Sequence, residues 1–483
     1  MTLAAETVFR PAIPPRRAGK PLSLLPFLWI SWRDPIRMWS ERHFDEPQLH
    51  GHSAFGEILV VSHPAGVRHV LTENAANYVK GDLQRRVLGP MLAEGLLLTE
   101  GETWRRARRI LAPLFTPARM ATLNARMAEV CAARIAAWSL SARGRVLDID
   151  SEMSGLTFDI LSATMFSDEL GGEAKGFERA LNQFLANGAR IDPLDVLGAP
   201  DWAPRLGRLA SVRSARFFEQ RVTRLVEARR ARIEAGEAAP DDLLSALLLA
   251  RDETGGPSSN GAGLSDEEVA ANILTFILAG HETTARALGW TLHLLSRQPE
   301  HLVRLQAEAD AFDVSDPKWA EGLPWTRAVL EETMRLFPPA PTMARKALAE
   351  DEIGGQRIAA GATVIISPWI LQRHRLLWDD PDAFRPERFL PQNRKAIERY
   401  AYIPFSAGPR VCIGAAFAMQ EAMIALAAVL RVAEVEPVVR DEPRPVHQIT
   451  LRSREPMRLR LRARRGRNGD SRPVSIDRAT PAP

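Results

Sequence analysis

Apolar side chains recur every three or four residues along most of the chain, which is the period of an amphipathic α-helix. The longest stretch of this kind begins at the capping-box residues Ser265 and Glu268 and continues to about Arg297. A second strongly apolar helical pattern covers residues 415–432. Patterns typical of strands are short, and they fall at residues 57–62, 146–149, 364–367 and 457–461. The sequence therefore predicts a mainly α fold with small peripheral β-sheets.

The N-terminal region holds one apolar stretch, at residues 22–32. Its eleven residues are too few to span a bilayer, which takes about 20. We therefore expect no transmembrane anchor and interpret the stretch as a first amphipathic helix, with contact at a membrane surface as the open alternative. Because no repeat or long linker divides the chain, we expect a single domain at residues 21–462. Tails at residues 1–20 and 463–483 are expected to be disordered.

Charge and cysteine content narrow the functional classes. A hydrophobic fraction of 46% and a charged fraction of 25% are ordinary for a globular protein. The formal net charge is +4, but residues 458–483 carry eight arginines and two aspartates, so the rest of the chain is close to neutral and is not expected to bind nucleic acid. The two cysteines, Cys131 and Cys412, are too far apart for a disulfide framework. This favours a reducing compartment, and we expect a cytoplasmic protein.

The second cysteine lies in the segment 405–414, directly before the second long helical pattern. A thiol just ahead of a helix lies near unpaired N–H groups, which favour thiolate and predict a lowered pKa. Phe405 can shield the sulfur from water, and Gly414 leaves room for a flat cofactor. Arg410 offers a cation for a carboxylate. For Cys412 taken alone a structural cysteine is the alternative, but the spacing Phe-x-x-Gly-x-Arg-x-Cys-x-Gly favours a metal ligand.

The middle of the longest helical pattern reads Ala-Gly-His-Glu-Thr-Thr over residues 279–284. Ala279, Gly280 and Thr283 fall on one face of the helix. Glycine and threonine weaken the backbone hydrogen bonds of a helix interior, so a groove for a small molecule is expected there. For Gly280 alone, a notch for helix packing is the alternative.

These two segments resemble the haem-binding loop and the oxygen-activation motif of the cytochrome P450 family, the haem-thiolate monooxygenases. The resemblance covers about residues 25–462 and implies that family's fold, with the haem between the long central helix and the cysteine-loop helix. It implies haem b (Fe-protoporphyrin IX) with Cys412 as the only protein ligand to iron. It also implies that Thr283, with Glu282 beside it, is catalytic and delivers protons to bound oxygen.

Other parts of the chain match the same family. Trp104 and Arg108, four residues apart on one helix face, resemble its propionate-binding motif, and an indole N–H and a guanidinium suit carboxylates. Arg345 and Arg410 take the places of two further propionate contacts, although a solvated arginine is the alternative for Arg345. The resemblance thus implies a cofactor site formed by Trp104, Arg108, Ala279, Gly280, Arg345, Phe405, Arg410, Cys412 and Gly414.

Glu332 and Arg335, three residues apart, would in isolation form a surface ion pair of small energy. Followed by Arg388, they resemble the family's buried charged triad. The resemblance implies that this triad holds the cysteine loop in place and does no chemistry.

The resemblance implies an oxidoreductase that inserts one oxygen atom from O2 into a C–H bond or a double bond. A separate ferredoxin and its reductase, which uses NAD(P)H, are expected to supply electrons, because the residues after Cys412 are too few for a flavin or ferredoxin module. We predict that the ferredoxin docks on Arg105, Arg106 and Arg109, which would face solvent. A peroxide-using or rearranging haem enzyme and a non-catalytic haem sensor are the alternatives.

The substrate is expected to be a lipophilic small molecule and the protein a monomer. By resemblance, the pocket is formed by the central helix and by four mostly apolar segments, residues 83–97, 184–209, 339–343 and 447–451.

Overall fold

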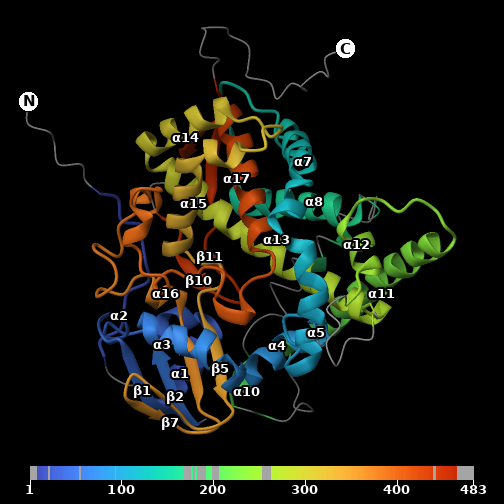
Figure 1. Ribbon diagram of the computed structural model, residues 1–483. Coiled ribbons are helices and arrows are strands. Elements are labelled where there is room, and N and C mark those ends of the chain that lie inside the picture. The colour runs from blue at the N-terminus through green and yellow to red at the C-terminus, as the bar shows by residue number, and fades with distance from the viewer. Residues whose placement is uncertain are drawn as a thin grey trace, which may run out of the picture.

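The computed structural model describes residues 8–464, apart from 20–21, 54–55, 93, 168, 170–175, 178–179, 182–191, 198, 200–205, 253–260, 262 and 439–441. Helices dominate this part of the chain (Figure 1). They are α1 (Leu24–Arg33), α2 (Arg42–Asp45), α3 (Pro64–Arg68), α4 (Asp82–Leu92), α5 (Gly101–Leu111), α6 (Pro117–Ala121), α7 (Asn124–Ala137), α8 (Ile149–Phe166), α10 (Pro193–Val196), α11 (Leu206–Glu234), α12 (Leu243–Leu249), α13 (Asp266–Ser296), α14 (Pro299–Ala311), α15 (Pro324–Leu336), α16 (Pro368–Leu371) and α17 (Ala415–Val432).

The strands form small, separate sheets, as the sequence predicts. The largest has the order β1-β2-β8-β5-β3, with β2 parallel to β8 and the other pairs antiparallel. A three-stranded sheet has the order β4-β12-β9, and β6-β7 and β10-β11 are two-stranded. The strands are β1 (Gln48–Ser53), β2 (Gly56–Val61), β3 (Tyr78–Lys80), β4 (Arg145–Asp148), β5 (Met343–Ala347), β6 (Asp351–Ile353), β7 (Gln356–Ile358), β8 (Thr363–Ile366), β9 (Ala433–Pro437), β10 (Pro445–His447), β11 (Leu451–Ser453) and β12 (Arg458–Ala463).

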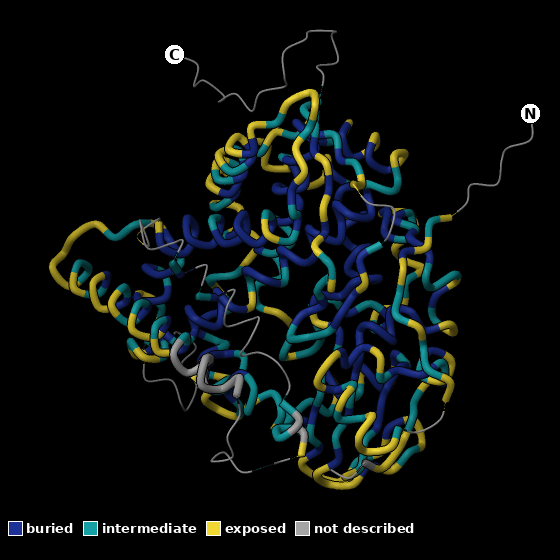
Figure 2. Tube along the Cα trace, turned by 180° about the vertical axis from the view of Figure 1, so that it is seen from behind, coloured by how far each residue is buried: buried dark blue, intermediate teal, exposed yellow. Residues whose placement is uncertain are grey.

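Helix α13 is the centre of the helical body. Its predicted start is confirmed, because Ser265 and Glu268 form a reciprocal capping box at the N-terminus. Most of its side chains are buried, and it packs against α8, α11, α15 and α17. The buried part of the trace gathers inside the body, whereas exposed residues lie along its rim (Figure 2). A central helix that is apolar on nearly all sides is expected to be enclosed in this way.

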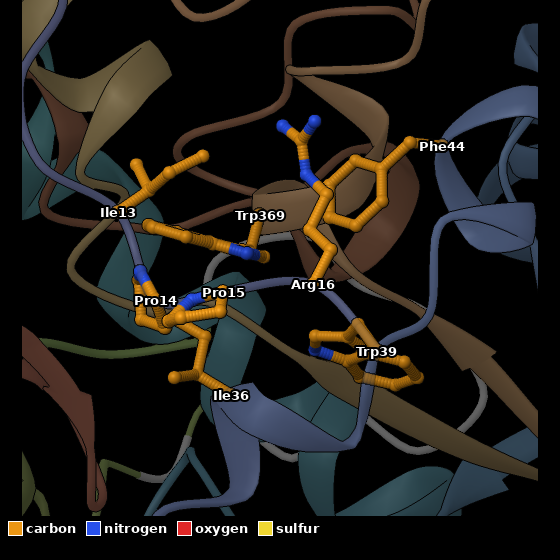
Figure 3. A pocket seen from close by; sticks show the side chains of 8 residues that line it. All are labelled: Ile13, Pro14, Pro15, Arg16, Ile36, Trp39, Phe44 and Trp369. Atoms are coloured by element: carbon orange, nitrogen blue, oxygen red, sulfur yellow. The ribbon is translucent and has the colours of Figure 1, made fainter. Parts of the chain in front are cut away.

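Residues 8–19, which the sequence predicts as part of a disordered tail, lie against the body instead. Arg16 donates to both carboxylate oxygens of Asp382 at 2.8 Å, and its guanidinium lies 4.1 Å from the centre of the Phe44 ring. Figure 3 shows this segment over Trp369, around a small pocket. At the other end, β12 continues to Ala463, one residue into the predicted tail.

Helix α17 is long and apolar enough to cross a membrane by length and composition, but 67% of it is buried inside the protein. It packs against α7, α13, α14 and α15, so it is a core helix. Helix α1, in contrast, leaves Leu25 and Trp29 exposed on its outer face.

Candidate active site

The cysteine loop requires glycine at position 408. Gly408 has a φ of +68°, and a Cβ atom there would lie 1.7 Å from the carbonyl oxygen of Leu71. The loop closes through the backbone N–H of Cys412, which donates to the carbonyl oxygen of Phe405 at 2.9 Å. A Cβ atom on Gly414 would meet no atom within 4 Å. The loop therefore presents the thiol beside open space, as a flat cofactor requires.

The sequence predicts a lowered pKa for the Cys412 thiol, but in the structure this pKa is raised. Loss of hydration within the protein raises it, although the residue keeps some contact with solvent, and this effect exceeds the lowering by the Gly414 N–H and by Arg108. Proximity to the N-terminus of α17 therefore does not by itself keep the thiol ionised. The other cysteine, Cys131, is fully buried in the core, and burial raises its pKa further.

Helix α13 is accessible at one place in its middle part, residues 272–295. Ala279 is exposed, and Gly280 and Thr283 are half-buried, whereas residues 272–278 and 284–295 are all buried. The hydroxyl of Thr283 donates to the carbonyl oxygen of Ala279 at 2.6 Å. These three residues therefore lie together at the one break in the buried stretch 272–295 of the helix.

Arg410 anchors the cysteine loop to α5. Its Nη1 donates to the carbonyl oxygen of Thr99 at 2.9 Å, and it pairs with the carboxylate of Glu100. Its guanidinium lies 3.8 Å from the centre of the Trp104 ring. Burial, partly offset by Glu100, lowers the pKa of Arg410 to about 10. The predicted residues Trp104 and Arg410 are thus in direct contact.

Arg345 has a cationic neighbour that the sequence did not reveal. In the β3–β5 register, Lys80 is the direct partner of Arg345, and both side chains are buried. Like charges directly opposite each other destabilise a sheet. Burial, reinforced by Arg410 and Arg345, lowers the pKa of Lys80 to about 7. Lys80 lies in a short strand outside any motif, so only the strand register identifies it.

The cation cluster of Lys80, Arg108, Arg345 and Arg410 fits a haem. Within the described ranges, Lys80, Arg108 and Arg345 form no ion pair, and the carboxylate of Glu100 is the acid that opposes the cluster. An interior excess of positive charge is unfavourable without anions. Two propionate groups would supply them, and the guanidinium forks suit carboxylates. The cluster, the open space at Gly414 and the thiol together match a haem.

The carboxylate of Glu282 lies in a buried ion-pair network. Its partners come from α13 itself, from β11 and from the residue before β11, and none belongs to the cysteine loop. Thr450 donates to its Oε1 at 2.8 Å, Arg452 pairs with the same oxygen, and Arg286 lies 3.6 Å away. Burial alone would raise the pKa of Glu282, but Arg452 and Arg286 lower it below its usual value. The carboxylate is therefore held ionised and tied to β11. Sequence reasoning missed Arg452, because it follows Glu282 by 170 positions.

The predicted triad assembles in the protein interior. Arg335 forms two hydrogen bonds to the Glu332 carboxylate, at 2.6 and 2.7 Å, and both side chains are fully buried. Arg388 Nε lies 3.7 Å from Glu332 Oε1. Gln372, which the sequence did not single out, accepts from the backbone N–H of Ile403 at 3.1 Å and donates to the carbonyl oxygen of Arg335. Gln372 thus links the triad to the start of the cysteine loop.

The predicted basic docking face on α5 is largely neutralised. Arg106 is half-buried and pairs with Glu268 at 2.8 Å, and Arg109 pairs with Asp252 at 3.1 Å. Arg105 is exposed and pairs with Glu102, at 3.2 Å. Two of the three arginines therefore fasten α5 to its neighbours, and the expectation that all three face solvent was wrong.

The fold, the cation cluster and the cysteine loop are those expected of a haem protein. Residues 50–460 match the family model of Cytochrome P450, and the chain belongs to the cytochrome P450 family. It is a P450 monooxygenase, as are relatives that carry oxygenase names.

Known relatives and structures agree with this assignment. The chain is 35% identical to cyclooctatin synthase of Streptomyces melanosporofaciens, over 82% of this chain and 84% of that protein. It is 33% identical to pentalenene oxygenase of Streptomyces avermitilis, over 84% of this chain and 88% of the relative. The crystal structure of the cytochrome P450DA heme domain superimposes with a TM-score of 0.76 at 26% identity, covering 91% of this chain and 93% of that one.

Proposed function

We propose that this monooxygenase hydroxylates or epoxidises a carbon-rich terpenoid, with haem b as cofactor and with electrons from a separate ferredoxin and NAD(P)H-dependent reductase. The single observation that supports an oxygenating site best is the accessible stretch at Ala279, Gly280 and Thr283 within the otherwise buried middle of α13, residues 272–295. Bacterial relatives support the substrate class, since they are named for oxygenation of pentalenene and of cyclooctat-9-en-7-ol, both unsaturated carbon skeletons. We place the enzyme in the cytoplasm, since both cysteines are free thiols. We further propose that it is a monomer.

Each proposed site residue has one physical task. Cys412 would ligate the iron, and Trp104, Arg108, Arg345 and Arg410 would hold the propionates. The bound haem supplies O2 activation, and thiolate ligation favours cleavage of the O–O bond. Among the predicted pocket segments, residues 83–97, which include most of α4, are tied to α13, because the Leu96 N–H donates to Asn272 at 2.9 Å. Most of the segment 184–209 lies outside the described residues.

In this proposal, Thr283 and Glu282 have different roles. Thr283 holds a proton at Oγ1 in the accessible stretch of α13 and exchanges its bond to Ala279 for one to a ligand. Glu282, held ionised by Arg452, positions α13 against β11 and is not the immediate proton donor.

The proton role of Thr283 is tested with Thr283→Ala. We expect haem content and substrate-induced spectral shifts to persist while product formed per NAD(P)H oxidised falls severalfold. Thr291→Ala is a matched control, because Thr291 makes the same bond one turn back, to Ala287 at 2.7 Å, but is fully buried. Equal coupling in both variants would refute the role of Thr283.

The reaction class is tested with 18O2, a surrogate ferredoxin system and a panel of terpenoids. One labelled oxygen atom per product supports the monooxygenase reaction. Product that forms from hydrogen peroxide alone, with no turnover from the ferredoxin system, would favour the peroxide-using alternative instead.

For the electron donor, we propose Arg105 as the docking residue, because Arg106 and Arg109 pair with residues outside α5. Arg105→Gln should slow reduction by an acidic ferredoxin and flatten its dependence on ionic strength, since surface charge steers association. Arg37→Gln, another exposed arginine, is the control. Identical rates and salt slopes in the two variants would place the docking site elsewhere.

A further inference from the structure

Two histidines and a glutamate converge on the outer hairpin of the five-stranded sheet. His50 and His52 are two residues apart on β1, so their side chains lie on one face of the strand. The β1–β2 register sets His52 opposite Glu57. His50 Nε2 lies 2.9 Å from Glu57 Oε1, and the two imidazole centres are 5.2 Å apart. In the described part of the chain, no other group of three histidine, cysteine or acidic side chains has its ligand atoms within 4.8 Å of one another.

These three side chains form a donor set that suits Zn2+. Metal–ligand bonds of about 2.0–2.2 Å place tetrahedral ligand atoms roughly 3.3–3.5 Å apart. His50 and Glu57 already lie at least as close as this, and the exposed His52 can rotate toward them. The backbone N–H of Ala359 donates to Glu57 Oε2 at 3.3 Å, so it orients the carboxylate, as outer partners of metal ligands do.

We propose that His50, His52 and Glu57 bind a divalent transition-metal ion of the Zn2+ class, with water as the fourth ligand. The site is independent of the haem. Strand β1 is at the edge of the sheet, and β2 and β8 separate it from β5, which carries Arg345. The ion would join the two strands of the hairpin at an edge that has no neighbouring strand. Its effect is therefore on the stability of this hairpin, by preferential binding to the folded state.

The test uses the haem-loaded protein without an affinity tag, after treatment with a chelator. Titration calorimetry with Zn2+ should show one ion per chain and a raised unfolding temperature in its presence. X-ray absorption at the zinc edge should show two imidazole ligands. His50→Gln and His52→Gln should each weaken Zn2+ binding at least tenfold, and Glu57→Gln should weaken it by a smaller factor.

A matched control is His69→Gln. The side chain of His69 is 29% exposed and lies 2.8 Å from Asp351, whereas that of His50 is 28% exposed and lies 2.9 Å from Glu57. Unlike His50, His69 belongs to no group of three possible ligands in the described residues, so its replacement should leave Zn2+ affinity unchanged. An unchanged haem spectrum verifies that each variant is folded. Absence of a stoichiometric Zn2+ site, or unchanged affinity in both the His50 and the His52 variants, would overturn the proposal.

Discussion

Replacement of Glu421 by glutamine should flatten the pH dependence of stability between about pH 4.5 and 8. Glu421 is fully buried on α17, and neither carboxylate oxygen has a well-formed hydrogen bond. Burial raises its pKa from 4.5 to about 8, and the hydroxyl of Thr284 on α13 offsets only part of this. The Cys131 thiol on α7 is a further titratable neighbour, and its raised pKa keeps it neutral in this range. Glu421 is therefore protonated in the folded enzyme at neutral pH.

The sign and size come from proton linkage. Between the two pKa values the folded state retains a proton that the unfolded state has lost, so stability falls as pH rises through this range. At about 1.4 kcal/mol for each pH unit between 4.5 and about 8, the loss has an upper limit of about 5 kcal/mol. Glutamine keeps the shape and cannot ionise, so the variant lacks this loss.

The assay is urea unfolding of both proteins at a series of pH values from 5 to 8, followed by far-ultraviolet circular dichroism. The wild-type free energy of unfolding should decline relative to that of Glu421→Gln as pH rises. Other titrating groups are common to both proteins and cancel in the difference. A constant difference across the range would mean that Glu421 is ionised in the folded state, and the reasoning from burial would be refuted.

Three sets of substitutions test three separate roles: ligation of the iron, charge opposite the haem propionates, and support of the cysteine loop. Cys412→His should lose the red-shifted Soret band of the reduced carbon-monoxide adduct, whereas Cys131→Ala should keep it; a thiolate spectrum in the Cys412 variant would refute the ligand assignment. Lys80→Met should release haem severalfold faster to an acceptor apoprotein, because one cation opposite the propionates is lost, and wild-type release would exclude that contact. Glu332→Gln leaves Arg335 buried without its carboxylate partner, so the free energy of unfolding in urea should fall by about 3–5 kcal/mol. A fall smaller than that caused by breaking an exposed ion pair would contradict the triad's role.

The sequence predicted the elements whose signals are local. The capping box at Ser265 and the apolar period after it determine α13 to within a residue or so, since both depend on neighbours within one helical turn. The cysteine loop was equally accessible, because Gly408 and Gly414 are needed for backbone shape and for space within the loop itself. The assembled triad was predictable only through resemblance to a family.

Features set by contacts between distant segments were not predictable in the same way. Lys80 becomes a site residue through its register with Arg345, which depends on how β3 and β5 pair. Arg106 was expected on a solvent-facing surface, but Glu268 of α13 pairs with it. The direction of the Cys412 pKa also depends on the surrounding protein, because the desolvation that raises it arises only when distant segments pack around the loop.

The ion-pair network at Glu282 explains how α13, which carries Thr283, and the predicted substrate segment 447–451 can keep a fixed distance. Thr450 lies within the segment 447–451, which the sequence predicts at the substrate pocket, and Arg452 directly follows it. Both contact the Glu282 carboxylate beside Thr283. Apolar packing alone tolerates small sliding movements, whereas a buried ion pair is strongly destabilised once one partner is displaced. Charge at this position therefore fixes α13 relative to β11 and the residue before it. In the proposed function, Glu282 therefore acts beside Thr283 by holding the helix in position.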